Sequence, residues 1–216
     1  MAGTSFINID VFSDVICPWC FIGKRRLEAA VTLYNNGRPK DAPVALKINW
    51  RAFLLNPAMQ RGGMDRQAYI NAKFGAAGTS FYERIAGVGL DVGINFNFAG
   101  ITRTPDSRPA LSLVISAGNN ANAVKQDLFD AYFLNGEDIG DDAVLAEIAG
   151  RYQLEYPAPQ SAHDQLEQDL IEVSRLGIQG VPFIVIENEW AVSGAHAPET
   201  FLPMFDAAIA KNADQT

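Results

Sequence analysis

The sequence lacks a long hydrophobic run, a repetitive tract and an excess of positive charge. Without about 20 consecutive apolar residues, we expect no membrane-spanning helix. The formal net charge of -8 argues against nucleic-acid binding, which rests on clustered lysine and arginine. The opening residues carry no basic leader, so we expect a cytoplasmic protein. The chain has 216 residues, 48% of them hydrophobic, which is enough for one packed core.

Cysteine and histidine are scarce as well, with two of each. Both cysteines, Cys17 and Cys20, lie in one Cys-Pro-Trp-Cys segment. A zinc site needs four ligands, and His163 and His196 are distant in sequence, so we expect no metal. A structural disulfide across so short a loop would restrict the unfolded chain little. The spacing therefore predicts a redox-active pair that needs no bound cofactor.

The periodicity around the cysteines changes from that of a strand to that of a helix. Residues 6–11 alternate, which predicts a strand, and apolar residues at helical spacing follow Cys20. Pro18 suits the first helical position, which places Cys17 at the N-terminal edge of the helix. The helix dipole favours a thiolate there, so Cys17 is predicted to attack a disulfide and Cys20 to resolve the mixed disulfide. Trp19, at an exposed helix start, is predicted to contact the client.

The rest of the sequence shows strand and helix patterns in turn. Residues 44–50 alternate, which predicts a second strand. The region that follows is mostly helical, with the spacing of a capping box beginning at Ser80. Ser161 is predicted to cap the next long helix, and Pro203 to bend the last one. The pattern indicates a strand–helix–strand unit with a helical insertion packed on the same core.

A Val181-Pro182 turn precedes a predicted hairpin with strands at 183–186 and 190–192. An X-Pro bond that opens a strand is a place where a cis peptide occurs. The trans form is the commoner one, and the turn taken alone does not decide between them.

The Cys-Pro-Trp-Cys segment, the GVPFIVI turn and the VSGAHAPETF ending together resemble the DsbA-family thioredoxin-like oxidoreductases, in particular their FrnE-like branch. Further similar stretches, such as RTPDS, extend the resemblance over nearly the whole chain. It implies an α/β, thioredoxin-like fold with an inserted helical domain. The thioredoxin-like core would then comprise residues 1–56 and 161–216, and the helical insertion residues 57–160.

The resemblance also implies roles around the cysteine pair. The Val181-Pro182 bond would be cis and face Cys17, so that these two residues, with Pro18 and Trp19, bind the substrate. The implied reaction is thiol-disulfide exchange with protein or small-molecule disulfides. Glutathione stays open as a co-substrate, and a monomer and a homodimer both fit.

This sequence departs from the family pattern at two places. After TPDS, the residues Pro109 to Ser112 replace a more polar stretch, so we expect a polar group of the substrate groove to be lost. The segment SGAH places His196 in the loop after the last strand, where we expect it to face water.

Two other functions fit parts of the sequence. The 2-hydroxychromene-2-carboxylate isomerases and kappa-class glutathione transferases use a related scaffold, but they usually keep a serine where Cys17 stands. A client-binding chaperone would use Trp19 and the helical insertion and leave the cysteines without a role. The intact cysteine pair favours redox chemistry over both, and a cytosolic setting favours the reductase or isomerase direction.

Overall fold

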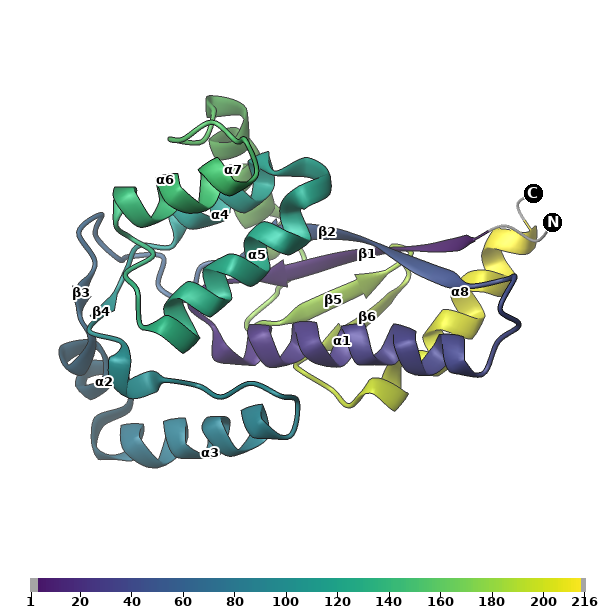
Figure 1. Cartoon of the computed structure of the whole chain (residues 1–216), viewed down its shortest axis with the longest axis horizontal. Coiled ribbons are helices and arrows are strands. Elements are labelled where there is room, and N and C mark those ends of the chain that lie inside the picture. Colours follow the sequence, from purple (N-terminus) through teal and green to yellow (C-terminus); the bar gives the residue numbers. More distant parts are fainter. Residues whose placement is uncertain (1–3, 215–216) are drawn as a thin grey trace.

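A computed structural model describes residues 4–214 of the chain. A four-stranded sheet with the strand order β2-β1-β5-β6 forms its centre (Figure 1). The central strand β1 is parallel to β2 and antiparallel to β5, and β6 pairs with β5 in a hairpin. The bounds are β1 Ser5–Ser13, β2 Val44–Ala52, β5 Phe183–Ile186 and β6 Trp190–Ser193. A small second sheet pairs β3 (Met64–Asp65) with β4 (Arg103–Thr104).

Helices connect and cover these strands. Helix α1 (Pro18–Asn36) joins β1 to β2 and runs along the sheet, whereas α2 to α6 gather around one end of it (Figure 1). Helix α7 (Gln160–Arg175) leads into β5, and α8 (Leu202–Asp214) follows β6. The intervening helices are α2 Arg66–Phe74, α3 Gly78–Leu90, α4 Arg108–Ser116, α5 Ala121–Asp130 and α6 Asp142–Arg151. This arrangement confirms the predicted α/β fold with a helical insertion.

The alternation of β1 explains where the core lies. Ile7, Ile9 and Val11 are buried on one face of the sheet, and Asn8 on the opposite face is exposed. One cluster of buried side chains runs from these residues through α1 into the insertion, where it includes Leu128 of α5. Because the sheet and the insertion share this core, the division at residues 56 and 160 stays a prediction.

Three local predictions about helix ends and bends were wrong. Ser161 lies inside the first turn of α7, where Pro159 occupies the capping position. Ser80 lies inside α3, and its hydroxyl donates to the carbonyl of Ala77. Pro203 is the second residue of α8, where a missing N–H costs no helical hydrogen bond, so it does not interrupt the helix.

In the part of the chain that the structure describes, no helix is both long and apolar enough to cross a membrane.

Candidate redox site

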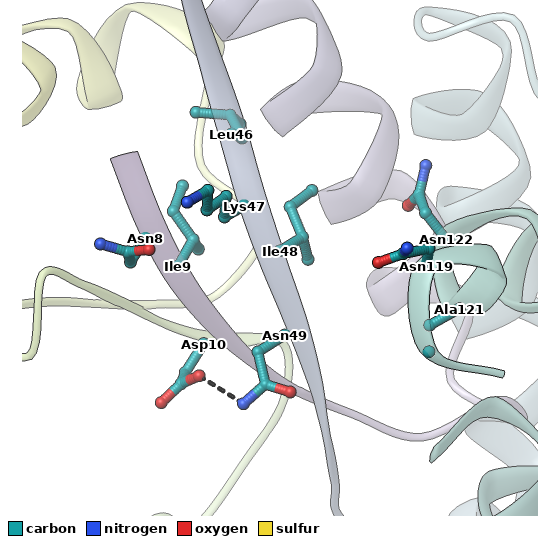
Figure 2. Close-up of a pocket in the computed structure, with 11 residues that line it drawn as sticks. Asn8, Ile9, Asp10, Leu46, Lys47, Ile48, Asn49, Asn119, Ala121 and Asn122 are labelled. Carbon is teal, nitrogen blue, oxygen red and sulfur yellow. Dashed lines mark hydrogen bonds between the residues drawn. The ribbon is translucent and has the colours of Figure 1, made fainter. Parts of the chain in front are cut away.

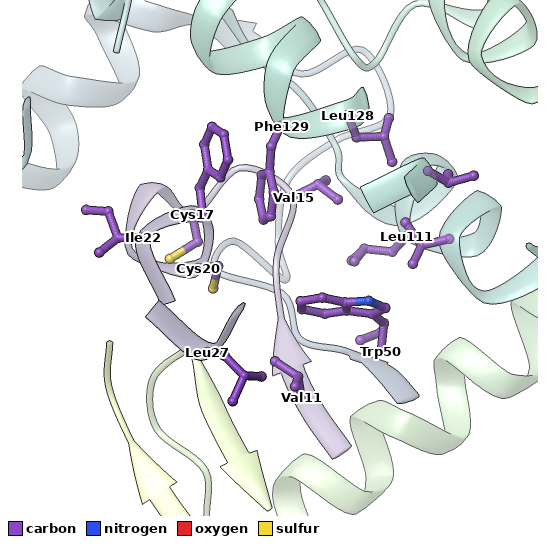
Figure 3. Close-up of a cluster of buried hydrophobic side chains, with 14 of the residues drawn as sticks. Val11, Val15, Cys17, Cys20, Ile22, Leu27, Trp50, Leu111, Leu128 and Phe129 are labelled. Carbon is purple, nitrogen blue, oxygen red and sulfur yellow. The ribbon is translucent and has the colours of Figure 1, made fainter. Parts of the chain in front are cut away.

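The two cysteines lie next to each other where the loop after β1 enters α1 (Figure 3). Cys17 occupies the capping position in an extended conformation (φ −96°, ψ 111°), and Pro18 is the first helical residue. The backbone N–H of Cys20 donates to the carbonyl of Cys17 at 3.0 Å. Both are free thiols, and Cys17 is 4% exposed against 1% for Cys20. The order of exposure is the predicted one, although only a narrow edge of Cys17 reaches the surface.

The turn before β5 packs against Cys17, although it is far away in sequence. The Val181-Pro182 peptide bond is cis, as the resemblance implied. The sulfur of Cys17 lies 3.7 Å from the carbonyl oxygen of Val181, to which the thiol donates. The carbonyl of Pro182 in turn accepts from the N–H of Gly194 at 2.8 Å, which ties the turn to the loop after β6. The hairpin thus fixes the proline beside the cysteine that begins α1.

The contact between α1 and this turn depends on Gly23. A Cβ atom added at Gly23 would lie 2.8 Å from Cγ of Pro182 and 3.6 Å from Cβ of Ala195. The first distance is too short for a real contact, so the helix and the proline approach this closely only because residue 23 has no side chain.

We expect Gly23→Ala to lower the free energy of unfolding by about 1–3 kcal/mol relative to a matched glycine change, because it overfills this contact. The control is Gly150→Ala in α6, where an added Cβ meets nothing within 4 Å and the gain in helix propensity acts alone. Urea unfolding of both variants checks the prediction. Equal stability of the two variants would show that Pro182 moves away from the added Cβ without lowering the free energy of unfolding.

A buried carboxylate holds the loop that carries the cysteines. Asp14 is fully buried, and it accepts hydrogen bonds from the N–H groups of Leu55 at 2.8 Å and Ile16 at 3.3 Å. Burial raises its pKa, and these backbone hydrogen bonds oppose the rise. Sequence reasoning missed Asp14, although a charged residue followed by two apolar ones just before Cys17 is a usable signal.

A buried lysine from the insertion also faces the site. Lys125 of α5 is 1% exposed, and its Nζ lies 5.3 Å from the ring centroids of both Trp50 and Phe129. Among the described residues, no hydrogen bond or ion pair of this ammonium is found. Burial lowers the pKa of Lys125 to about 8, against the opposing influence of Cys20, Asp14 and Cys17. The insertion thereby supplies a positive charge to the cysteine pair.

The contact between the two thiols and the nearby Lys125 both change the pKa values of Cys17 and Cys20. Burial raises the pKa of the Cys17 thiol, and the neighbouring Cys20 raises it further. Burial acts in the same direction on Cys20, but the adjacent Cys17 thiol, the neighbouring Ser13 hydroxyl and, after these, the ammonium of Lys125 together outweigh it, so the pKa of Cys20 is lowered. In the resting dithiol the negative charge is therefore favoured on Cys20. The role of Cys17 as the attacking thiolate, expected from its place at the helix start, stays a prediction.

The structure places the remaining predicted residues as follows. Pro18 is buried, and Trp19 is half-buried against the core, so less of its ring is free for a client than an exposed helix start implied. His196 is exposed and donates through Nε2 to the carbonyl of Ser193 at 2.9 Å, which agrees with its predicted place at the surface.

A cavity of about 640 Å³ lies apart from the cysteines, over β1 and β2 and the start of α5 (Figure 2). Its walls mix polar and apolar side chains, and Asn49 donates to the carboxylate of Asp10 there at 2.8 Å. Within residues 4–214, no group of three or more histidine, cysteine or acidic side chains is arranged to hold a metal ion.

The fold and the cysteine geometry define a thioredoxin-like protein with a Cys-x-x-Cys pair at a helix start and a cis-proline opposite it. Residues 8–205 match the family profile of the DSBA-like thioredoxin domain. The chain therefore belongs to the DsbA-like thioredoxin family of thiol-disulfide oxidoreductases.

Individual relatives are distant in sequence but similar in length. The chain is 24% identical over 204 residues to the uncharacterized protein YwbO of Bacillus subtilis (strain 168), with 90% of this chain and 94% of YwbO covered. Among solved structures, the probable DsbA oxidoreductase SCO1869 from Streptomyces coelicolor superposes with a TM-score of 0.79 at 22% identity, covering 94% of this chain and 90% of that one.

Two further structures share the fold. The cytosolic disulfide reductase DsbM from Pseudomonas aeruginosa superposes with a TM-score of 0.55 at 18% identity, covering 96% of this chain and 98% of that one, and it has also been solved with GSH. A 2-hydroxychromene-2-carboxylate isomerase superposes with a TM-score of 0.60 at 15% identity, covering 97% of this chain and 99% of that one. The fold alone therefore does not separate redox from isomerase chemistry.

Proposed function

We propose that this protein catalyses thiol-disulfide exchange by cycling Cys17 and Cys20 between a dithiol and a disulfide. The observation that carries the proposal is the position of Cys17. It is the more exposed of the two cysteines, and it lies beside the carbonyl of Val181 and the cis-proline Pro182. The Pro18-Trp19 surface and the Val181-Pro182 turn would bind the substrate around it.

The charge distribution suggests how the steps follow one another. The Cys20 thiolate accepts the proton of Cys17, and the resulting Cys17 thiolate attacks one sulfur of a substrate disulfide. A mixed disulfide forms, and the other substrate sulfur leaves as a thiolate. Cys20 then gives its proton to the departed substrate thiolate, with Lys125 stabilising the negative charge that remains, and attacks Cys17. This step forms the Cys17–Cys20 disulfide and releases the second substrate thiolate, so the substrate gains the two electrons that the protein loses.

We infer that the substrates are protein or small-molecule disulfides, and that glutathione acts as a co-substrate. The structure of DsbM with GSH supports a small thiol at a site of this kind. All the groups named above come from one chain, so exchange needs no second copy, and both a monomer and a homodimer are consistent with it. We further propose a cytoplasmic location and a reductase or isomerase direction, since a cytosol keeps such pairs reduced.

Reduction of insulin disulfides with dithiothreitol as the electron donor tests the proposal. The protein is expected to shorten the lag before insulin precipitates, because its thiols exchange faster than the free donor does. The same protein with both thiols alkylated by iodoacetamide is the control and is expected to leave the lag unchanged. If the untreated and alkylated proteins act alike, exchange at the cysteines is refuted.

The same samples separate redox chemistry from an isomerase of this fold. An isomerase that merely activates glutathione would turn over without oxidising Cys20. Mass spectrometry of the protein after reaction with oxidised glutathione is expected to show the Cys17–Cys20 disulfide, two hydrogens lighter than the dithiol. A glutathione-dependent reaction that leaves both thiols reduced throughout would favour the isomerase instead.

A further inference from the structure

Arg66, the first residue of α2, is a buried cation without a carboxylate partner. The residue is 7% exposed, and the guanidinium lies over the rings of Tyr82 and Tyr69, 4.8 and 5.6 Å from their centroids. The guanidinium donates to the hydroxyl of Thr104 at 3.2 Å, and its buried Nε has no partner among the described residues. No ion pair of Arg66 is found among these residues either. Buried charges are normally paired, so this guanidinium has unused capacity for an anion.

A cavity opens beside this guanidinium. It has a volume of about 380 Å³, lies between α2 and α3, and includes Arg66 in its wall. Three aromatic rings line it beside smaller apolar residues and the polar Gln67 and Thr79: Phe96 stacks on Phe98 at 4.7 Å, and Tyr82 packs on Phe98 at 4.9 Å. These contacts hold the walls in place, and the volume falls within the range of pockets for small organic molecules.

The charges around the cavity limit what it can bind. Arg66 is the cation in its described lining, and the exposed Glu83 lies in the same wall. A multiply charged phosphate would meet one cation and one carboxylate there. A planar carboxylate needs only one guanidinium, whose paired N–H groups match its two oxygens. We propose that the cavity between α2 and α3 binds a small organic carboxylate, with the carboxylate on Arg66 and an apolar body between the aromatic rings.

This cavity is separate from the redox pair but close to it. Phe96, in the cavity wall, packs edge-on against Phe21 with centroids 5.9 Å apart, and Phe21 directly follows Cys20. The cavity shares no residue with the groups that act in thiol exchange. Binding there is therefore independent of the redox proposal, and a failure of one leaves the other standing.

Calorimetric titration with phenylacetate, and with its uncharged analogue phenylacetamide, tests the proposal on the full chain. Phenylacetate is expected to bind at millimolar or lower concentration, and phenylacetamide at least about tenfold more weakly, because the amide lacks the charge that pairs with Arg66. Arg66→Met is expected to weaken phenylacetate binding to the level of the amide. Hexanoate in place of phenylacetate shows whether the apolar body must be aromatic.

Three further variants make the result specific. Ala86→Phe fills the cavity from α3 while leaving Arg66 in place, and it is expected to abolish binding even if Arg66→Met does not fold. Glu83→Gln is expected to bind phenylacetate as tightly as the wild type or more tightly. Arg84→Gln removes an exposed arginine outside the cavity lining and should change nothing. The proposal is overturned if neither carboxylate binds at millimolar concentration, if acid and amide bind equally, or if Ala86→Phe binds like the wild type.

Discussion

Cys17→Ser is expected to abolish disulfide exchange, whereas Cys20→Ser is expected to stop it halfway. Without Cys17 no thiol is left near the surface, since Cys20, the other cysteine of the sequence, is only 1% exposed. Without Cys20 the mixed disulfide on Cys17 still forms but has no second thiol to resolve it. The two substitutions are matched in size and chemistry, so any difference between them reports position rather than the loss of a sulfur.

Insulin reduction and mass spectrometry together check this prediction. Both variants should lose the acceleration of insulin precipitation. After incubation with oxidised glutathione, Cys20→Ser should carry one glutathione per chain, and Cys17→Ser should carry none. Accumulation of the adduct on Cys17→Ser instead would assign the attack to Cys20, the sulfur on which the resting negative charge is favoured.

Lys125→Met is expected to make the reduced protein more stable at pH 7 by about 3 kcal/mol, since it removes a buried ammonium. Burial lowers the pKa of this lysine from 10.5 to about 8, and each unit of pKa corresponds to about 1.4 kcal/mol. Below pH 8 both the folded and the unfolded chain bind the proton, so the full cost of burying the charge is present. As the pH rises from 8 toward 10.5, the folded protein releases the proton first, and the cost declines.

Urea unfolding at a series of pH values measures this effect. The stability difference between Lys125→Met and the wild type should be largest at pH 7 and should shrink steadily above pH 8. Lys24→Met is the matched control, because Lys24 is also buried but forms an ion pair with Glu28. That variant is expected to gain no stability. A Lys125 variant that is less stable than the wild type at pH 7 would contradict the argument.

The same substitution is expected to make the protein a weaker oxidant. The ammonium of Lys125 favours the thiolate of the reduced form, so its removal should destabilise the dithiol relative to the disulfide. We expect the redox potential to become more negative by about 30 mV, a tenfold change in the equilibrium constant. Equilibration of both proteins in glutathione buffers, followed by mass spectrometry of the disulfide fraction, measures the change. An unchanged potential would mean that Lys125 does not act on the cysteines.

Local patterns in the sequence were sufficient to predict the part of the site that is built from residues close together in the chain. The alternation before Cys17, the helical spacing after Cys20 and the proline at the first helical position together predict the strand, the helix and the position of the pair. The strands at 183–186 and 190–193 follow from the same kind of pattern. Each of these features depends on residues that are neighbours in the chain.

The residues that sequence reasoning missed are buried charges. Lysine and arginine normally lie at the surface, so the composition of α5 gives no reason to place Lys125 in the core. Its burial depends on Trp50, a residue on a strand far away in sequence, and that of Arg66 on Tyr82 in another helix. The prediction of a helix cap at Ser161 failed for a related reason. Ser161 is a residue type that often caps helices, but Pro159 occupies the capping position of α7.

The position of β5 in the centre of the sheet has a consequence for how the protein is made. Strand β1 lies between β2 and β5, so it lacks one neighbour until the ribosome has added residues 183–186. Val181, whose carbonyl meets the sulfur of Cys17, is translated 164 residues after it. Throughout that interval the nascent chain presents two thiols without the turn that later packs against them. The contact between Cys17 and the proline turn can therefore form only after more than four fifths of the chain has been made.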